Sequence, residues 1–306
     1  METAQELMKL IFNAALVVMI MATMFGAGLS TTLSALGGVF KNVKLLILVL
    51  LAALIVRPLV GWGTAAALSL ATPAFIAMLL LAACPGAPFG AKLVMTSRGD
   101  VVTGASLQVL LAAIGSITFP ITASLLIGAA NLGDDITIPV WDLIKTVAFL
   151  QLVPFAAGIA VRHWSPESAA KWNPPVAQIS NVTLLIVLVL AILGSWSTLV
   201  ALIGSRTLLA AIIFAVVMLI VGYFLATGDK VRRTSTALIE PCSNTGPVMA
   251  AVAIGFNNDP EILSAVVAIN LLQIIVGVFA ASYIAKGRPA PEEAAAEVPA
   301  AEAQPA

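Results

Sequence analysis

Long apolar stretches follow one another along almost the whole chain, and they limit what it can fold into. A helix of about 20 apolar residues spans a bilayer, and inside lipid it satisfies its own backbone hydrogen bonds. On this rule we predict about nine spanning segments: 7–28, 45–68, 71–95, 101–130, 139–163, 176–199, 204–227, 233–256 and 260–285. The fold class is therefore an all-α polytopic membrane protein within a lipid bilayer.

The composition agrees with this class. Hydrophobic residues make up 60% of the 306 residues and charged residues 10%, whereas soluble domains carry about 25% charge. The formal net charge is zero, so nothing indicates a nucleic-acid partner. The first apolar segment is followed by another rather than by a cleavage site, and we expect no signal peptide. Residues 287–306 are rich in Ala, Pro and Glu, and we expect a disordered tail.

Two of the apolar segments are interrupted in the middle. Residues 83–92 read ACPGAPFGAK and residues 240–247 read EPCSNTGP. Because proline removes a backbone donor and clashes with the preceding turn, neither helix can run on unbroken. We predict that the breaks cross and form the binding site of a secondary transporter with inverted repeats. The residues predicted at the breaks are Cys84, Pro85, Gly86, Pro88, Pro241 and Gly246.

The order of the segments and the loop charges predict a topology. The interrupted segments are the third and the eighth, and this odd offset makes them antiparallel, as an inverted repeat requires. Segments 5–9 would form one repeat, and segments 1–4 the other, without its first helix. Basic residues gather in the loops after segments 1, 3, 5 and 7. The positive-inside rule then predicts an inner (plasma) membrane protein with the amino terminus outside and the carboxyl terminus in the cytoplasm.

Ionisable residues inside the segments are costly and therefore functional candidates. Glu240, at the second break, can bind a cation, carry a proton, pair with a base or cap the helix. Lys92 either extends to the membrane surface or pairs with Glu240. Arg57, within LLAALIVRPLVGW, is expected to have a buried partner or to bind an anion.

Polar residues near the breaks complete the candidate substrate or ion site. Ser243, Asn244 and Thr245 follow Glu240 and can either bind a ligand or satisfy backbone donors at a helix start. Gln108 and Asn270 lie in neighbouring apolar helices, where interhelical hydrogen bonding is the simpler interpretation.

No enzyme or cofactor is predicted. The chain has no Walker loop, and its two cysteines and one histidine suggest neither a metal site nor a disulfide framework. Two alternatives to a carrier of a substrate molecule stay open. One is a cation/proton antiporter on a related crossing-helix fold, and the other is a membrane sensor or scaffold that does not transport.

Three motifs resemble those of the bile acid:sodium symporter family. MFGAGL at residues 24–29 resembles the family's MFGMGL-like start. CPG at residues 84–86 with RGD at residues 98–100 matches its CPGG…RGN spacing, and residues 240–246 resemble its Glu…Gln-Asn-Ser-Gly stretch. The resemblance covers nearly the whole chain.

The resemblance implies a division of residues 1–286 into two parts and a class of substrate. A core with the crossing helices would cover about 45–130 and 204–285, and a smaller panel would cover about 7–28 and 139–199. Members carry organic anions such as bile acids, sulfated steroids or small carboxylates inward, usually with sodium. We therefore expect a secondary transporter of a small organic anion.

The sodium ligands implied by the resemblance are largely missing here. The family's sodium-binding Ser and Asn positions fall on Gly90 and Ala91, and its hydroxyl positions in the next helix fall on Gly104 and Gln108. A family glutamine falls on Ala53. Because Lys92 and Arg57 lie nearby, a fixed cation can neutralise Glu240 instead. We expect loss of sodium coupling, with transport either proton-coupled through Glu240 and Lys92 or facilitative.

Overall fold

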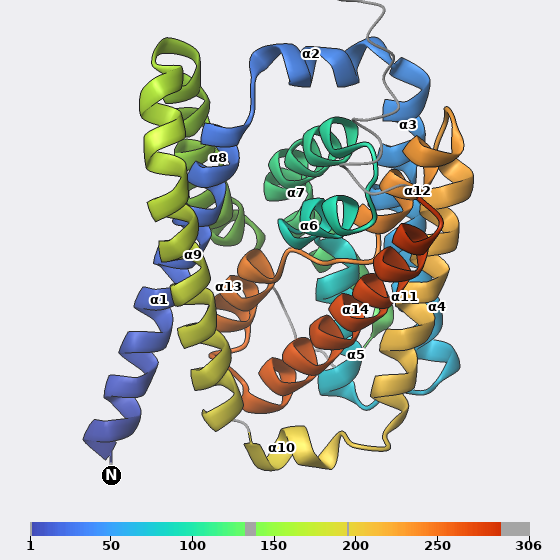
Figure 1. Ribbon diagram of the computed structural model, residues 1–306. Coiled ribbons are helices and arrows are strands. Elements are labelled where there is room, and N and C mark those ends of the chain that lie inside the picture. Colours follow the sequence, from blue (N-terminus) through green and yellow to red (C-terminus); the bar gives the residue numbers. More distant parts are fainter. Residues whose placement is uncertain (1, 132–138, 195, 289–306) are drawn as a thin grey trace, which may run out of the picture.

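The protein is helical throughout the part that the structure describes, residues 2–131, 139–194 and 196–288, with no strand in these ranges. In this computed structural model (Figure 1), seven helices are long and apolar enough to cross a membrane. They are α1 (Glu2–Ser30), the continuous α3 (Val43–Leu51), η1 (Ala52–Val56) and α4 (Arg57–Ala67), α7 (Val101–Ala130), α8 (Val140–Trp164), α9 (Pro166–Gly194), α11 (Arg206–Leu225) and α14 (Pro260–Lys286).

Most of these helices agree with the predicted segments to within a few residues, and α7 coincides with residues 101–130. The exception is α9. The segment predicted at 176–199 in fact begins at Pro166 and ends at Gly194. Polar residues such as Glu167 and Asn173 occupy its first turns. The apolar pattern therefore marks where a helix becomes suited to lipid and not where its backbone hydrogen bonding begins.

Both interrupted helices are present as predicted. The first consists of α5 (Thr72–Ala83) and α6 (Phe89–Thr96), and the second of α12 (Lys230–Ile239) and α13 (Thr245–Gly255). Gly86 adopts a φ of +85°, and a Cβ there would lie 2.3 Å from the backbone N of Ala112. Only glycine meets both conditions at that break. Gly246 was predicted at the second break, but it lies within the first turn of α13.

Two short helices were not predicted. α2 (Leu33–Lys41) packs against α7 and runs across the top of Figure 1, and α10 (Trp196–Ala201) lies at the bottom. The side chain of Thr32 caps α2 by accepting a hydrogen bond from the N–H of Ala35 at 3.2 Å. Both helices are shorter than a bilayer span, so the search for long apolar stretches passed over them.

Helices α1, α8 and α9 pack together, and they stand side by side at the left of Figure 1. The contact between α1 and α8 depends on Gly28 and Gly158, since a Cβ on Gly28 would lie 2.9 Å from the Cα of Gly158. Small residues allow such close approach in membrane helices. The helices α4, α7 and α14 pack against α5, whose Leu79, Leu80 and Leu81 are fully buried.

Polar contacts join the end of α14 to the loop between α6 and α7. Arg288 donates to the carbonyl oxygen of Ser97 at 2.9 Å and to the hydroxyl of Thr234. The start of the predicted tail is therefore held in place, which corrects the prediction of disorder for residues 287 and 288. The rest of that tail, residues 289–306, lies outside the described residues.

Candidate functional site

The two breaks contact each other through their backbones. The N–H of Asn244 donates to the carbonyl oxygen of Cys84 at 3.0 Å. Both residues are buried. Since proline and glycine free backbone groups at each break, this bond satisfies one group from each interrupted helix. The predicted crossing of the interrupted helices is thus a direct contact.

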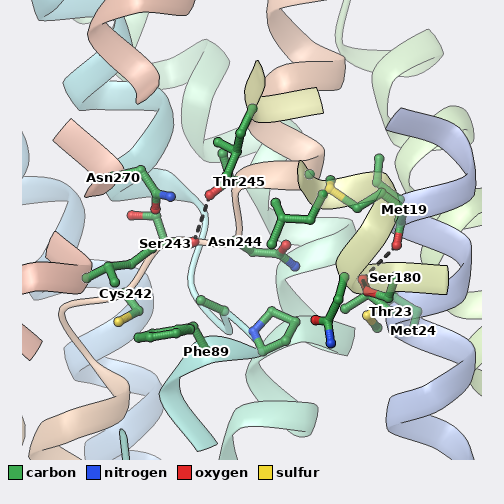
Figure 2. Close-up of a pocket in the computed structure, with 18 of the residues that line it drawn as sticks. Met19, Thr23, Met24, Phe89, Ser180, Cys242, Ser243, Asn244, Thr245 and Asn270 are labelled. Atoms are coloured by element: carbon green, nitrogen blue, oxygen red, sulfur yellow. Dashed lines mark hydrogen bonds between the residues drawn. The ribbon is translucent and has the colours of Figure 1, made fainter. Parts of the chain in front are cut away.

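A cavity of about 150 Å³ lies between this crossing and the pair α1 and α9. Figure 2 shows side chains from both sides around it, including Asn244 and Thr245 opposite Met19 and Thr23. It is lined by Met19, Ile20, Thr23, Met24, Ala87, Pro88, Phe89, Lys92, Gln151, Ser180, Asn181, Leu184, Leu188, Cys242, Ser243, Asn244, Thr245, Gly246, Asn270, Leu271 and Ile274. Ligand cavities of this kind are mostly apolar with a few polar groups.

The cavity is electropositive on the side of the crossing. The starts of α6 and α13 both line it, through Phe89 and Thr245. The amino-terminal end of a helix carries a partial positive charge and free N–H donors. Lys92, one turn further along α6, adds a full positive charge. Together these groups favour a negatively charged ligand.

Five of the predicted binding residues line this cavity. Four of them come from the crossing itself, and Asn270 comes from α14. The five are Lys92, Ser243, Asn244, Thr245 and Asn270. Thr245 Oγ1 also donates to the carbonyl oxygen of Ser243 at 3.4 Å, which holds that hydroxyl against the break. Of the predicted break residues, Pro88 and Gly246 line the cavity too.

Glu240, Arg57 and Gln108 do not line the cavity. Glu240 is 1% exposed, and its carboxylate oxygens have no hydrogen-bond partner among the residues that the structure describes. The predicted pairing of Lys92 with Glu240 is wrong, because Lys92 is exposed and makes no ion pair within the described ranges. The side chain of Glu240 instead packs towards α11, where a Cβ on Gly222 would lie 2.8 Å from its Cγ.

The surroundings of Arg57 agree with the first of its two interpretations, that of a buried residue with partners. It is 0% exposed and donates hydrogen bonds to α5 and to the second break.

Gln108 serves the first break: its Oε1 accepts from the backbone N–H of Ala91 in the first turn of α6, at 2.6 Å. That bond satisfies a helix-start donor, which was the simpler interpretation of a polar residue here.

Gln151, Ser180 and Thr23 also line the cavity, and the sequence analysis missed them. Gln151 accepts from Ser116 Oγ at 2.7 Å, whereas its Nε2 has no hydrogen-bond partner. Thr23 and Ser180 share a hydrogen bond of 2.6 Å between α1 and α9. Gln151 was detectable as an amide within an apolar segment, by the rule that selected Gln108. No sequence signal marked Thr23 or Ser180.

The positions that the resemblance assigns to sodium do not fit a sodium site in this chain. Gly90 and Gly104 offer no side-chain oxygen, and Gln108 Oε1 is already bonded to the N–H of Ala91. Space is short as well: a Cβ on Gly90 would lie 3.2 Å from the Cα of Ile239, and one on Gly104 would lie 2.9 Å from Val94 Cγ2. Ligand oxygens of the family type cannot be added there without movement of the neighbouring helices.

Seven long apolar helices, two interrupted helices in contact and a cavity at their crossing define a multi-pass helical membrane protein of the transporter class. The profile of the Sodium Bile acid symporter family matches residues 16–202, and the chain belongs to this family. The match covers the first interrupted helix and ends before the second. Comparison with curated proteins gave no match.

Proposed function

We propose that the protein is a secondary transporter that carries a small organic anion, of the bile-acid, steroid or carboxylate kind, across the membrane by alternating access. The observation that carries this proposal is the cavity at the crossing. Two helix starts and Lys92 supply positive charge there, while Met19, Ile20 and Leu184 supply apolar surface. An amphipathic anion matches this combination because its charged group and its apolar body each meet a complementary wall.

The cavity lies where two moving parts would meet. We propose that α1, α8 and α9, within residues 7–28 and 139–199, form the panel, and that residues 45–130 and 204–285 form the core. The mutual packing of α1, α8 and α9 supports this division. Alternating access then consists of movement of one part against the other around the crossing.

A second, larger hollow supports an access route. It measures about 730 Å³ and is lined by Glu6, Lys9 and Phe12 of α1 and by residues 190, 191, 193 and 194 of α9. The cavity at the crossing is lined by later residues of α1 and earlier residues of α9. The two spaces therefore follow each other along the same helix pair. On α1, the buried Leu16 falls between the residues that line the two spaces.

The proposed topology has nine spans in the inner (plasma) membrane, namely the seven long helices and the two interrupted ones. The amino terminus lies outside and the carboxyl terminus in the cytoplasm, as the loop charges favour. The two interrupted spans belong to inverted repeats, the first of which lacks one helix. An antiporter is less well supported, since Glu240 is the only fully buried acid among the described residues.

Uptake by proteoliposomes tests the function. Purified protein is first screened by thermal unfolding against bile acids, steroid sulfates and small carboxylates, since a ligand at 100 times its Kd stabilises by about 2.7 kcal/mol. Uptake of a stabilising anion is then measured, with and without an imposed pH gradient, to separate proton coupling from facilitated transport. Lys92→Ala should weaken binding, whereas the matched surface variant Lys171→Ala should not. Binding without uptake would indicate a sensor and overturn the proposal.

A further inference from the structure

The carboxyl-terminal ends of two half-helices meet at the crossing, on the side away from the cavity. α5 ends at Ala83, and α12 ends at Ile239. The last carbonyl oxygens of a helix have no partner within it, and they carry the negative end of its dipole. Buried together, two such ends need a cation, and interrupted helices of transporters commonly coordinate sodium in this way.

Arg57 supplies a positive charge to the end of α5. Its Nε donates to the carbonyl oxygen of Ala82 at 3.1 Å, and one Nη donates to that of Leu81 at 3.2 Å. Both acceptors lie in the last turn of α5. Arginine is suited to this position because its planar group presents several donors in a fixed geometry.

The same guanidinium reaches the end of α12. The Nη that does not bind Leu81 donates to the carbonyl oxygen of Glu240 and, at 3.3 Å, to that of Cys242. The other donates to Ser243 Oγ at 2.6 Å. With the two bonds to α5, the five N–H donors of the guanidinium are all used. A fully buried arginine is thus satisfied almost entirely by backbone carbonyls that would otherwise lack partners.

The local backbone brings Arg57 to this point. η1 is a π-helical turn in which the N–H of Arg57 donates to the carbonyl oxygen of Ala52. Such a wide turn rotates the following side chains relative to an α-helix and accommodates Pro58, which has no N–H. One turn later, a Cβ on Gly61 would lie 2.3 Å from the Cβ of Ala82, so α4 and the end of α5 are in close contact.

We propose that Arg57 is a built-in cation that occupies the position where a coupling sodium would otherwise be held by the ends of α5 and α12. The coupling role of that sodium rests on the proposed function. Occupancy of the site by Arg57 does not, because it is a property of the folded protein. Arg57 already places a positive charge beside the buried Glu240, whose backbone carbonyl it binds, and a further cation would leave this buried region with an uncompensated charge. Folding and anion binding therefore require no sodium.

Removing the guanidinium should turn a sodium-independent protein into a cation-dependent one. Thermal unfolding of the purified protein is measured in sodium, potassium and choline chloride at one ionic strength, without any organic anion. The wild-type Tm should be equal in the three salts. Arg57→Ala should lower the Tm by about 5–10 °C in choline chloride, because it removes the positive charge beside the buried Glu240 and leaves several carbonyls unpaired. Millimolar sodium or guanidinium should restore part of that loss saturably.

Arg206→Ala is the matched control, since Arg206 is exposed and donates to a single carbonyl oxygen, that of Leu68. It should show no salt-specific recovery. If Arg57→Ala does not fold, Arg57→Lys takes its place, because one ammonium cannot reach all five acceptors and should leave a partial sodium response. A saturable, sodium-specific rise of the wild-type Tm would overturn the proposal, and so would Arg57 variants that respond to salt as Arg206→Ala does.

The salt-dependence test and the transport assay can each overturn one proposal without affecting the other. Sodium-dependent uptake of an anion by the wild type would overturn the built-in cation and leave the transporter proposal intact. Absence of any uptake, with a Tm that ignores sodium and an Arg57→Ala variant rescued by guanidinium, would overturn the transporter proposal alone.

Discussion

The backbone N–H of Asn244 and the carbonyl oxygen of Cys84 are joined by a hydrogen bond of 3.0 Å, which links the unwound parts of two helices from opposite halves of the chain. On one side of this bond the starts of α6 and α13 line a cavity. On the other, Arg57 binds the ends of α5 and α12. The crossing thus separates a region suited to anions from a region already filled by a cation.

Asn244→Pro should destabilise the protein more than Asn244→Ala. Asn244 has a φ of −75°, which proline can adopt, so the main loss is the N–H that donates to Cys84. A buried carbonyl without a partner costs about 1–3 kcal/mol. Asn244→Ala keeps that N–H and serves as the control. Thermal unfolding in detergent measures both, and equal Tm values for the two variants would show that the backbone bond contributes little.

Gly28→Ala should loosen the contact between α1 and α8. The added Cβ would lie 2.4 Å from the carbonyl oxygen of Phe155, a backbone atom that cannot move alone. Overpacking of this kind costs about 1–3 kcal/mol. Gly128→Ala is the control on a helix, since a Cβ there meets nothing within 4 Å, and it should be neutral or stabilise by about 0.5–1 kcal/mol. Similar shifts in Tm for both would contradict the prediction.

Gln151→Leu should weaken binding of the organic anion. The Nε2 of Gln151 has no protein partner although the residue lines the cavity. Loss of a hydrogen bond to a charged group costs about 1.5–3 kcal/mol, or roughly a ten- to hundred-fold rise in Kd. Gln151→Glu should weaken binding further because it adds a like charge.

Ser116→Ala is the control for this pair of variants. It removes the 2.7 Å bond from Ser116 to Gln151 Oε1 but keeps the Gln151 amide, and Ser116 does not itself line the cavity. Its Kd should stay near the wild-type value. Unchanged anion affinity in Gln151→Leu would exclude this amide from the binding site.

Asp100 should make stability depend on pH. Burial acts to raise the pKa of this carboxyl, but hydrogen bonds from Thr103 and the Arg232 guanidinium outweigh it and lower the pKa. A carboxyl with a lowered folded-state pKa stabilises above its unfolded pKa of about 3.9, and the contribution disappears as the pH falls through the folded value. The Tm advantage of wild type over Asp100→Asn should therefore be present at neutral pH and shrink in acid. A pH-independent difference would contradict this.

Much of the architecture follows from local sequence. The helix at residues 101–130 agrees with the predicted segment, because an apolar run is a local signal, and the Asp100 cap that the structure shows at its start also acts over a few neighbours. The breaks observed at residues 84–88 and 240–244 fall within the predicted stretches 83–92 and 240–247 for a similar reason, since Pro85, Pro88 and Pro241 prevent continuous helical hydrogen bonding wherever they lie.

The partners of the buried charges did not follow from sequence. Lys92 and Arg57 were both predicted as fixed cations near Glu240, and for Lys92 the alternative of reaching the membrane surface stayed open. The π-helical turn η1 and the close approach at Gly61 instead bring Arg57 to the crossing, while Lys92 stays exposed at the cavity. Such assignments depend on the rotation of one helix against another, which residue spacing along a single helix does not reveal.

The sequence by itself determined that this protein crosses a membrane many times as helices, and where two of those helices break, because lipid leaves the backbone no partner but itself and proline removes a donor. Only the tertiary structure decided which residues meet at the breaks. Ser180 of α9 and Gln151 of α8 joined the cavity, and Arg57 bound carbonyls of α5 and of the residues that follow α12. The physical reason is that contacts between distant helices depend on their mutual rotation and depth, which arise from packing of the whole chain.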